Sequence, residues 1–191
     1  MKKELQHFLG VINFYRRFLQ GAAGTLLPLS NLLKGKKNDF VWTEQCSIAF
    51  ENAKQLLANA TLLRHPDPSK SICLYTDASD FAIGATLSQE DDGSFSPLAF
   101  FSRKLAEVET KYAKFDRELL AVYLSIKHFR HMLEGRVFPV ITDHKPLTKA
   151  MALPSNKSPR QTRQLSFISE FTTDIRYVKG CLLYTSDAAD E

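Results

Sequence analysis

The chain has 191 residues, of which 44% are hydrophobic and 24% charged, values close to the average of globular proteins. Its length allows one domain with a full core plus a smaller appendage. Without a targeting signal or an apolar run near the ~20 residues of a membrane helix, we expect an intracellular, cytoplasmic protein. The formal net charge of +4 is too small to establish nucleic-acid binding by itself.

The first 66 residues predict a small helical unit. Apolar residues recur at three- and four-residue intervals over residues 4–19, which indicates an amphipathic helix that ends near Gly21 and Gly24. A short helix is expected over residues 29–33. A third helix begins after Thr43, whose hydroxyl can cap the first turn, and runs to about residue 58. Two prolines then exclude both a helix and a central strand, so we expect a boundary between units 1–66 and 67–180.

The second unit begins with three predicted strands, over residues 72–77, 82–88 and 98–102, with a turn at residues 91–93. The strongest periodic pattern follows, a stripe of apolar residues from Val108 to Leu133 that predicts one long helix.

A fourth strand is expected over residues 137–142, then a proline-containing basic loop, a helix over residues 159–171 and a last strand over residues 174–178. The order βββαβαβ predicts an α/β fold, in which helices flank a mixed five-stranded sheet.

Three acidic residues suggest a common site. Asp77 and Asp143 each close an apolar strand, and open sheets bind ligands at strand carboxyl ends. Glu118 lies on the helix flank that faces the sheet, where a carboxylate needs a partner. If the three converge, their charges repel unless cations hold them, and magnesium suits such a set of oxygen ligands. Each acid alone could be a cap, a turn residue or half of a salt bridge, so only the combination of the three points to a metal site.

These acids lie in sequence blocks that resemble the signature blocks of the RNase H domain in gypsy-class LTR retrotransposons. The blocks are LYTDAS at residues 74–79, RELLAV at residues 117–122 and TDHKPL at residues 142–147. The resemblance implies an RNase H-like fold, cleavage of the RNA strand of RNA–DNA hybrids, and two Mg²⁺ ions, for which Mn²⁺ can substitute. It also implies that Asp77, Glu118 and Asp143 are the catalytic metal ligands.

Upstream, residues 5–19, reading LQHFLGVINFYRRFL, resemble the thumb and connection segment of the same reverse transcriptases. The polymerase active site of these enzymes has no counterpart here, so the implied partners are the RNA–DNA hybrid and the fingers and palm of a parent polyprotein. A retroelement particle in the cytoplasm is the location that the resemblance implies. The alternatives are a catalytically silent hybrid-binding or connection module and an expressed retroelement relic.

Basic residues outnumber acidic ones by seven to two between Lys145 and Lys179, a distribution that suits phosphate contacts as well as an ordinary solvated surface. Other polar residues near the three acids are further candidates. The residues expected to contact nucleic acid are Ser79, Arg103, Lys104, His144, Lys145, Arg160 and Arg163.

The tail departs from the family pattern. The family continues after Lys-Gly with a segment whose aspartate is a fourth metal ligand, whereas residues 181–191 read CLLYTSDAADE. This tail back-translates into an end adapter of transposase-based sequencing libraries. We hypothesise that it is an adapter-derived artefact on a domain truncated after Gly180, with Asp187 as a weak candidate ligand. Genomic DNA that encodes the chain through Glu191 would contradict this hypothesis.

Overall fold

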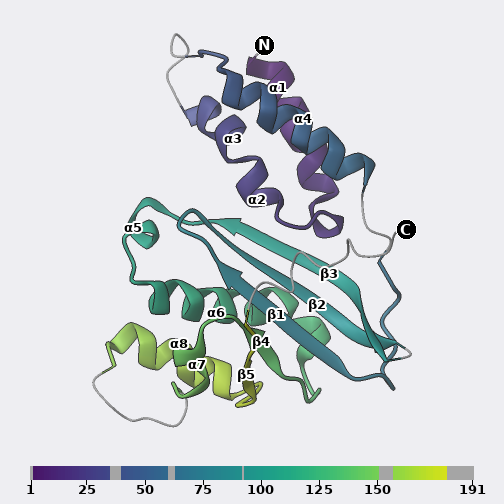
Figure 1. The fold of residues 1–191 in the computed structure, drawn as a ribbon, viewed down its shortest axis with the longest axis vertical. Helices are drawn as coiled ribbons and strands as arrows, with labels where there is room; N and C mark the ends of the chain where they lie inside the picture. The colour runs from purple at the N-terminus through teal and green to yellow at the C-terminus, as the bar shows by residue number, and fades with distance from the viewer. Residues whose placement is uncertain (1, 35–39, 60–62, 92, 151–156, 180–191) are drawn as a thin grey trace.

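The computed structural model describes residues 2–34, 40–59, 63–91, 93–150 and 157–179. An N-terminal helical unit stands at one end of a sheet that is flanked by helices (Figure 1). The predicted boundary between residues 66 and 67 stays a prediction; the last helix of the first unit ends at Ala58, and the first strand begins at Ile72.

The helical unit is built around a small apolar core of its own. Leu5, Leu9 and Ile12 recur on one face of the first helix and are buried, as the periodicity predicts. The Thr43 hydroxyl accepts a hydrogen bond from the Cys46 amide, which confirms the predicted helix cap. The elements are α1 (Lys2–Phe14), the 3-10 helix η1 (Arg16–Phe18), α2 (Ala22–Thr25), α3 (Leu27–Lys34) and α4 (Glu44–Ala58).

The first predicted helix is too long, since α1 ends at Phe14 and η1 follows it. Gly21 does not end a helix. Its φ of 64° is a left-handed conformation that glycine adopts without strain. Gly21 is the N-cap of α2, a helix that the sequence pattern did not predict. The apolar periodicity continues through this reversal because both sides of it contribute to one core.

The five-stranded sheet is mixed, as predicted, and its strands lie in the order β3-β2-β1-β4-β5. The first three strands form an antiparallel meander, whereas β4 pairs in parallel with both β1 and β5. The crossover between β3 and β4 therefore brings the end of β4 beside the end of β1. The strands are β1 (Ile72–Ala78), β2 (Ala82–Asp91), β3 (Ser94–Lys104), β4 (Val140–Thr142) and β5 (Ile175–Tyr177).

The single long helix predicted from residue 108 is wrong. The chain forms a short α5 (Glu107–Thr110) and then α6 (Lys114–Leu133), and Val108 is 69% exposed instead of buried. The Glu109 carboxylate accepts hydrogen bonds from the Ala106 amide and the Arg103 guanidinium. These bonds fasten the short helix to the edge of the sheet as a separate turn.

The fourth strand is shorter than predicted. Val137 is 96% exposed, and strand pairing begins only at Val140. Pro139 has no amide hydrogen to donate to a neighbouring strand, which explains the late start. The predicted basic loop also contains a short helix, α7 (Lys145–Thr148).

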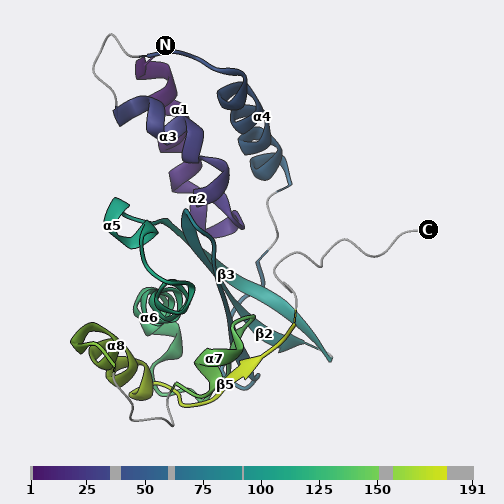
Figure 2. The ribbon, with the colours of Figure 1, turned by 60° about the vertical axis from the view of Figure 1, so that its left-hand side comes forward.

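Two helices cover one face of the sheet (Figure 2). Buried residues of α6, such as Ile126 and Phe129, share a core with Leu74 of β1 and Leu87 of β2. The helix α8 (Pro159–Ser169) lies beside α6 and has the predicted proline in its first turn.

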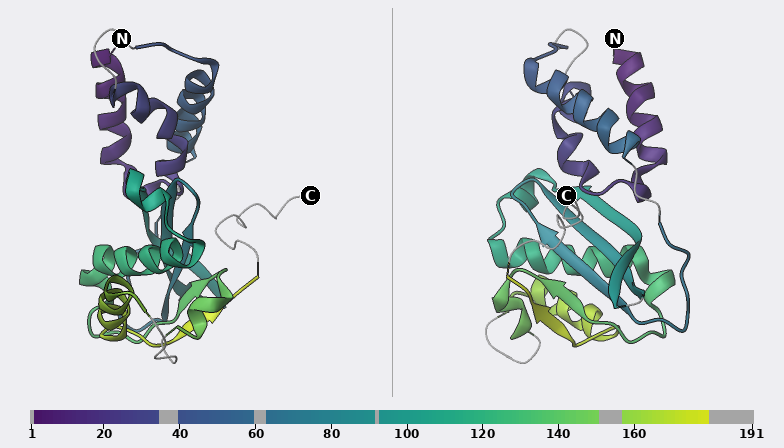
Figure 3. Two further views of the ribbon diagram at one scale, coloured as in Figure 1. Left: turned by 90° about the vertical axis from the view of Figure 1, so that its left-hand side faces the viewer. Right: turned by 45° about the vertical axis from the view of Figure 1, so that its right-hand side comes forward.

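The helical unit contacts the edge strand β3 (Figure 3). The Ala23 amide and the Arg16 guanidinium both donate to the Ser102 hydroxyl, at 3.2 Å and 3.4 Å. Lys104 donates to the Asn31 side chain at 2.6 Å. In the described part of the chain, no helix is long and apolar enough to cross a membrane.

Candidate metal centre

Three elements bring the predicted carboxylates to one point. Asp77 lies near the carboxyl end of β1, Asp143 follows β4, and Glu118 lies in the second turn of α6. Because β1 and β4 are adjacent and parallel, their ends meet at the same edge of the sheet. One carboxylate oxygen from each residue lies within 4.8 Å of the others.

Glu118 is the most unusual member of this cluster. It is 0% exposed, and neither of its carboxylate oxygens has a hydrogen-bond partner. The Ala78 amide donates at 2.8 Å to Asp77 Oδ1; it also lies near enough to Glu118 to lower the pKa of that carboxyl, as the smallest of its causes, without completing a regular hydrogen bond to it. A buried carboxylate without donors is costly in its charged form.

The electrostatics follow from this burial. Burial first, and then the charges of Asp77 and Asp143, together raise the pKa of Glu118 from 4.5 to about 8. Burial also raises the pKa of Asp77, with Asp143 as the second cause. The cluster therefore takes up protons unless a cation neutralises it.

The donor set fits a divalent cation. Mg²⁺ prefers carboxylate oxygens, and a cation among the three would supply the partner that the Glu118 oxygens lack. Asp143 is the most open of the three, with a side chain that is 36% exposed. The buried Glu118 would thus bind from the protein side and Asp143 from the solvent side.

Two basic residues that sequence reasoning missed lie at this centre. Lys114 Nζ is 4.0 Å from Asp143 Oδ2, and Arg117 pairs at 2.7 Å with Asp80 in the turn that follows β1. Arg117 thereby links the helix that carries Glu118 to the strand that carries Asp77. Its position beside Glu118 in the sequence was an available signal, but its partner could not be read from the sequence.

Three of the predicted nucleic-acid contacts are engaged within the protein. The Ser79 hydroxyl accepts from the Phe81 and Ala82 amides and so closes the turn after β1. Arg103 pairs with Glu109 at 2.7 Å, and Lys104 bonds to the helical unit. Their contacts with nucleic acid stay predictions, and any such contact competes with these internal bonds.

The other predicted contacts lie around the metal centre or on α8. His144 follows Asp143 directly, and its Nε2 is buried without a hydrogen-bond partner. Burial and then Lys114 lower the pKa of His144. Lys145 is exposed on α7 and Arg163 is exposed on α8.

Arg160 is held within the protein, because its guanidinium lies 3.8 Å from the centre of the Tyr112 ring and pairs with Asp116 at 3.2 Å. Asp187, the weak fourth ligand, lies outside the described residues.

Comparison of the sequence with protein families and curated proteins finds close relatives. The family described as "RNase H-like domain found in reverse transcriptase" matches residues 42–140. The Tf2-3 and Tf2-4 transposon polyproteins of Schizosaccharomyces pombe are each 40% identical over 193 residues. Each match covers 98% of this chain but 14% of the polyprotein, so the chain spans about one seventh of the length of these relatives.

Solved structures with a similar fold come from foamy viral protease-reverse transcriptase. The dRH form in complex with double-stranded DNA has a TM-score of 0.77 at 20% identity, over 94% of this chain and 32% of that one. The complex with an RNA/DNA hybrid has a TM-score of 0.73 at 22% identity, over 100% of this chain and 26% of that one. At this identity the likeness shows a shared fold, which confirms the predicted α/β architecture.

The raised pKa of Glu118 predicts how stability depends on pH. Between 4.5, its ordinary pKa, and about 8, its value in the fold, the folded protein binds the proton more tightly than the unfolded chain does. The free energy of unfolding of the metal-free protein should therefore fall as pH rises through this range, with a contribution of up to about 1.4 kcal/mol per pH unit.

Urea unfolding at pH 5 to 8 measures this slope. The slope should be shallower in Glu118→Gln. A 10-fold increase in Mg²⁺ concentration should raise the free energy of unfolding of the parent most at the alkaline end of this range. The control Glu134→Gln alters an exposed acid at the end of the same helix and should keep the parent slope. Identical slopes in Glu118→Gln and the parent would contradict the assignment.

Proposed function

The chain belongs to the family of RNase H-like domains found in reverse transcriptase. We propose that it hydrolyses the RNA strand of RNA–DNA hybrids as an endonuclease that uses divalent metal ions. The observation that carries the proposal is the convergence of Asp77, Glu118 and Asp143 within 4.8 Å around a buried carboxylate without a partner. A structural role does not require three acids at one point with a single lysine beside them.

The proposed cofactor is a pair of Mg²⁺ ions, for which Mn²⁺ can substitute. When bound, the ions activate a water molecule and stabilise the leaving oxygen of the phosphodiester. Asp77, Glu118 and Asp143 hold them, and Asp187 is a weak candidate for a fourth ligand. Glu118 contributes a charge shielded from water, so its attraction to a cation is stronger than that of an exposed acid.

The proposed substrate follows from the surroundings of the metal centre. The exposed Lys145 and Lys149 lie just beyond Asp143 on the chain and can contact phosphates, while Lys114 lies 4.0 Å from Asp143. The foamy viral relative of similar fold was solved with an RNA/DNA hybrid, which supports the same class of partner here.

The proposed context is a retroelement polyprotein. The Tf2 relatives are transposon polyproteins of which this chain spans one seventh, so the reverse transcriptase fingers and palm are expected partners within one longer protein. We propose that residues 1–66 act as the thumb and connection segment and residues 67–180 as the nuclease domain. The cytoplasmic particle of such an element is the proposed location.

A hybrid-cleavage assay tests the proposal. The purified chain with Mg²⁺ or Mn²⁺ should cut the RNA strand of a labelled hybrid, and Asp77→Asn or Glu118→Gln should lower the rate by at least about 100-fold, since each removes a charge that holds the ions. Glu134→Gln on the same helix should cut like the parent.

The tail requires a second version of the protein, in which residues 181–191 are replaced by the corresponding segment of the Tf2-3 polyprotein. Cleavage by either version that disappears in Asp77→Asn supports the nuclease. If both versions bind the hybrid and neither cuts it, the catalytically silent binding module is correct and the nuclease proposal is wrong.

A further inference from the structure

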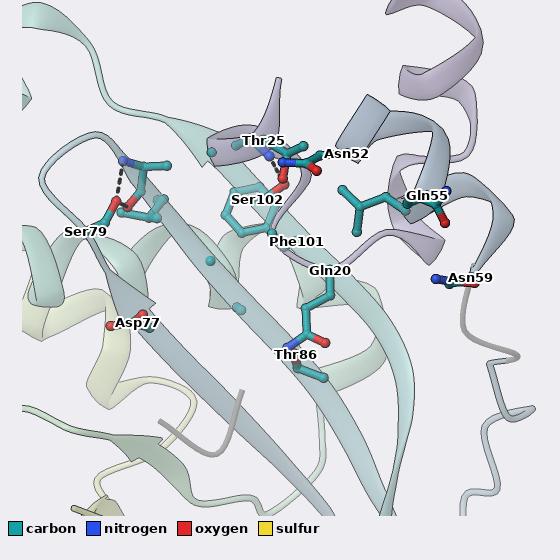
Figure 4. Close-up of a pocket in the computed structure, with 18 residues that line it drawn as sticks. Gln20, Thr25, Asn52, Gln55, Asn59, Asp77, Ser79, Thr86, Phe101 and Ser102 are labelled. Carbon is teal, nitrogen blue, oxygen red and sulfur yellow. Dashed lines mark hydrogen bonds between the residues drawn. The ribbon is translucent and has the colours of Figure 1, made fainter. Parts of the chain in front are cut away.

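The place of the Glu118 carboxylate is not fixed by hydrogen bonds of its own. Both of its oxygens are buried without a regular partner, whereas Asp77 Oδ1 accepts from the Ala78 amide at 2.8 Å. Asp77 also lines a groove between the helical unit and the sheet, so part of its surface is open (Figure 4). The backbone of β1 therefore holds Asp77, while the position of Glu118 depends on how α6 is fastened to the sheet.

Apolar packing holds α6 against the sheet without fixing its position closely. Leu120 and Ala121 lie three and four residues after Arg117, on the same face of the helix. They share a small buried cluster with Ala78 and Ile83. Burial of apolar surface is non-directional, so these contacts resist separation more than they resist sliding. A metal ligand has to be held within about 0.5 Å, which calls for a directional contact.

Arg117 supplies such a contact. Its side chain is 14% exposed, and its Nη2 lies 2.7 Å from Asp80 Oδ1 in the turn after β1. Its Nη1 donates at 3.4 Å to the Thr110 carbonyl at the end of α5. Because the guanidinium is planar and rigid, one side chain relates three elements to one another. The other ion pairs of α6 among the described residues lead to Asp143, to α8 or along the helix itself.

The turn that carries Asp80 is itself held firmly. The Ser79 hydroxyl accepts from the Phe81 and Ala82 amides, and the Ser79 amide donates to the Ala82 carbonyl at 2.9 Å. The Phe81 carbonyl accepts at 2.8 Å from the amide of Leu105, which lies just after β3. The ion pair therefore connects α6 to a well-fastened part of the sheet.

The charge of Arg117 has little direct effect on Glu118. Burial and the two neighbouring aspartates raise the pKa of Glu118, and Lys114 lowers it, whereas Arg117 has no part in the shift. The guanidinium is directed to Asp80 and to the Thr110 carbonyl instead. Loss of the pair should therefore affect a bound metal through the position of Glu118.

We propose that the Arg117–Asp80 pair positions Glu118 relative to Asp77 and thereby makes the metal centre favour Mg²⁺ over the larger Ca²⁺. The inference rests on the proposed nuclease function, because that function places Mg²⁺ among the three acids. Mg²⁺ requires near-ideal octahedral geometry at about 2.0–2.1 Å, whereas Ca²⁺ accepts about six to eight oxygens at about 2.3–2.6 Å in flexible arrangements. Displacement of Glu118 should therefore lower the affinity for Mg²⁺ more than that for Ca²⁺.

Calorimetric titration of the purified chain with Mg²⁺ alone and with Ca²⁺ alone tests the inference. Arg117→Gln removes a cation near the centre, and Asp80→Asn removes an acid while keeping a residue that suits turns. Charge alone would give opposite effects, with tighter metal binding in the first variant and weaker binding in the second. The positioning role predicts the same effect in both, a loss of about 10-fold for Mg²⁺ and of less than about threefold for Ca²⁺.

Three further variants sharpen the comparison. The variant that combines Asp80→Asn and Arg117→Gln should bind Mg²⁺ about as weakly as either single variant, since both break one contact. Arg117→Lys keeps the charge but cannot span both acceptors, so it should retain only part of the Mg²⁺ affinity. Arg130→Gln breaks the exposed pair with Glu134 at the other end of α6, and should bind both ions like the parent.

Thermal melting in EDTA, followed by circular dichroism, checks that each variant is folded at the temperature of the titration. The Asp80 side chain is 71% exposed, so Asp80→Asn should fold even if Arg117→Gln does not, and its ratio of Mg²⁺ to Ca²⁺ affinity then decides. Variants that bind both ions like the parent, that lose the same factor on both, or that change in opposite directions would overturn the inference.

Cleavage of a labelled hybrid by the parent in Mg²⁺, measured in parallel, keeps the two proposals apart. A parent that binds Mg²⁺ and cuts, with variants that bind like it, overturns the positioning role alone. A parent that binds Mg²⁺ without cutting, with variants that selectively lose Mg²⁺, overturns the nuclease and supports the pair as part of a metal centre. A parent that binds no Mg²⁺ overturns both.

Discussion

The buried carboxylate of Glu118 is the main physical constraint at the point where β1, β4 and α6 meet. Its carboxylate is 0% exposed, has no hydrogen-bond donor and lies with two other acids within 4.8 Å. Such a group is stable only when protonated or when a cation lies beside it. The fold thus makes the domain's stability depend on its occupancy by protons or metal, which connects binding to folding in the same site.

Each neighbouring element fixes one member of this cluster. The parallel pairing of β1 and β4 sets the distance between Asp77 and Asp143, and the first turns of α6 set Glu118. The Arg117–Asp80 pair connects α6 to the turn after β1, and Asp116 accepts from Gln161 and pairs with Arg160 on α8. These contacts hold the helix at its amino-terminal end, where the carboxylate lies.

The sequence predicted the succession of five strands and two main helices along the chain and the three acids, because apolar periodicity and strand ends are local features. It did not predict the internal partners of Arg103 and Lys104, since Glu109 and Asn31 become their neighbours only after folding. The break between α5 and α6 was missed because Val108 continues the apolar spacing while it points to solvent. The groove between the helical unit and the sheet could not be predicted either, because its walls come from α2, α4 and the first three strands, which are far apart in the chain.

The most direct test of the metal centre is a crystal structure of the protein soaked in Mn²⁺, with anomalous difference density as the readout. We expect density in contact with Asp77, Glu118 and Asp143, at about 2.0–2.3 Å from carboxylate oxygens of each. Density that is absent at saturating Mn²⁺, or that lies elsewhere while Glu118 stays unpaired, would contradict the claim that a cation compensates this buried carboxylate.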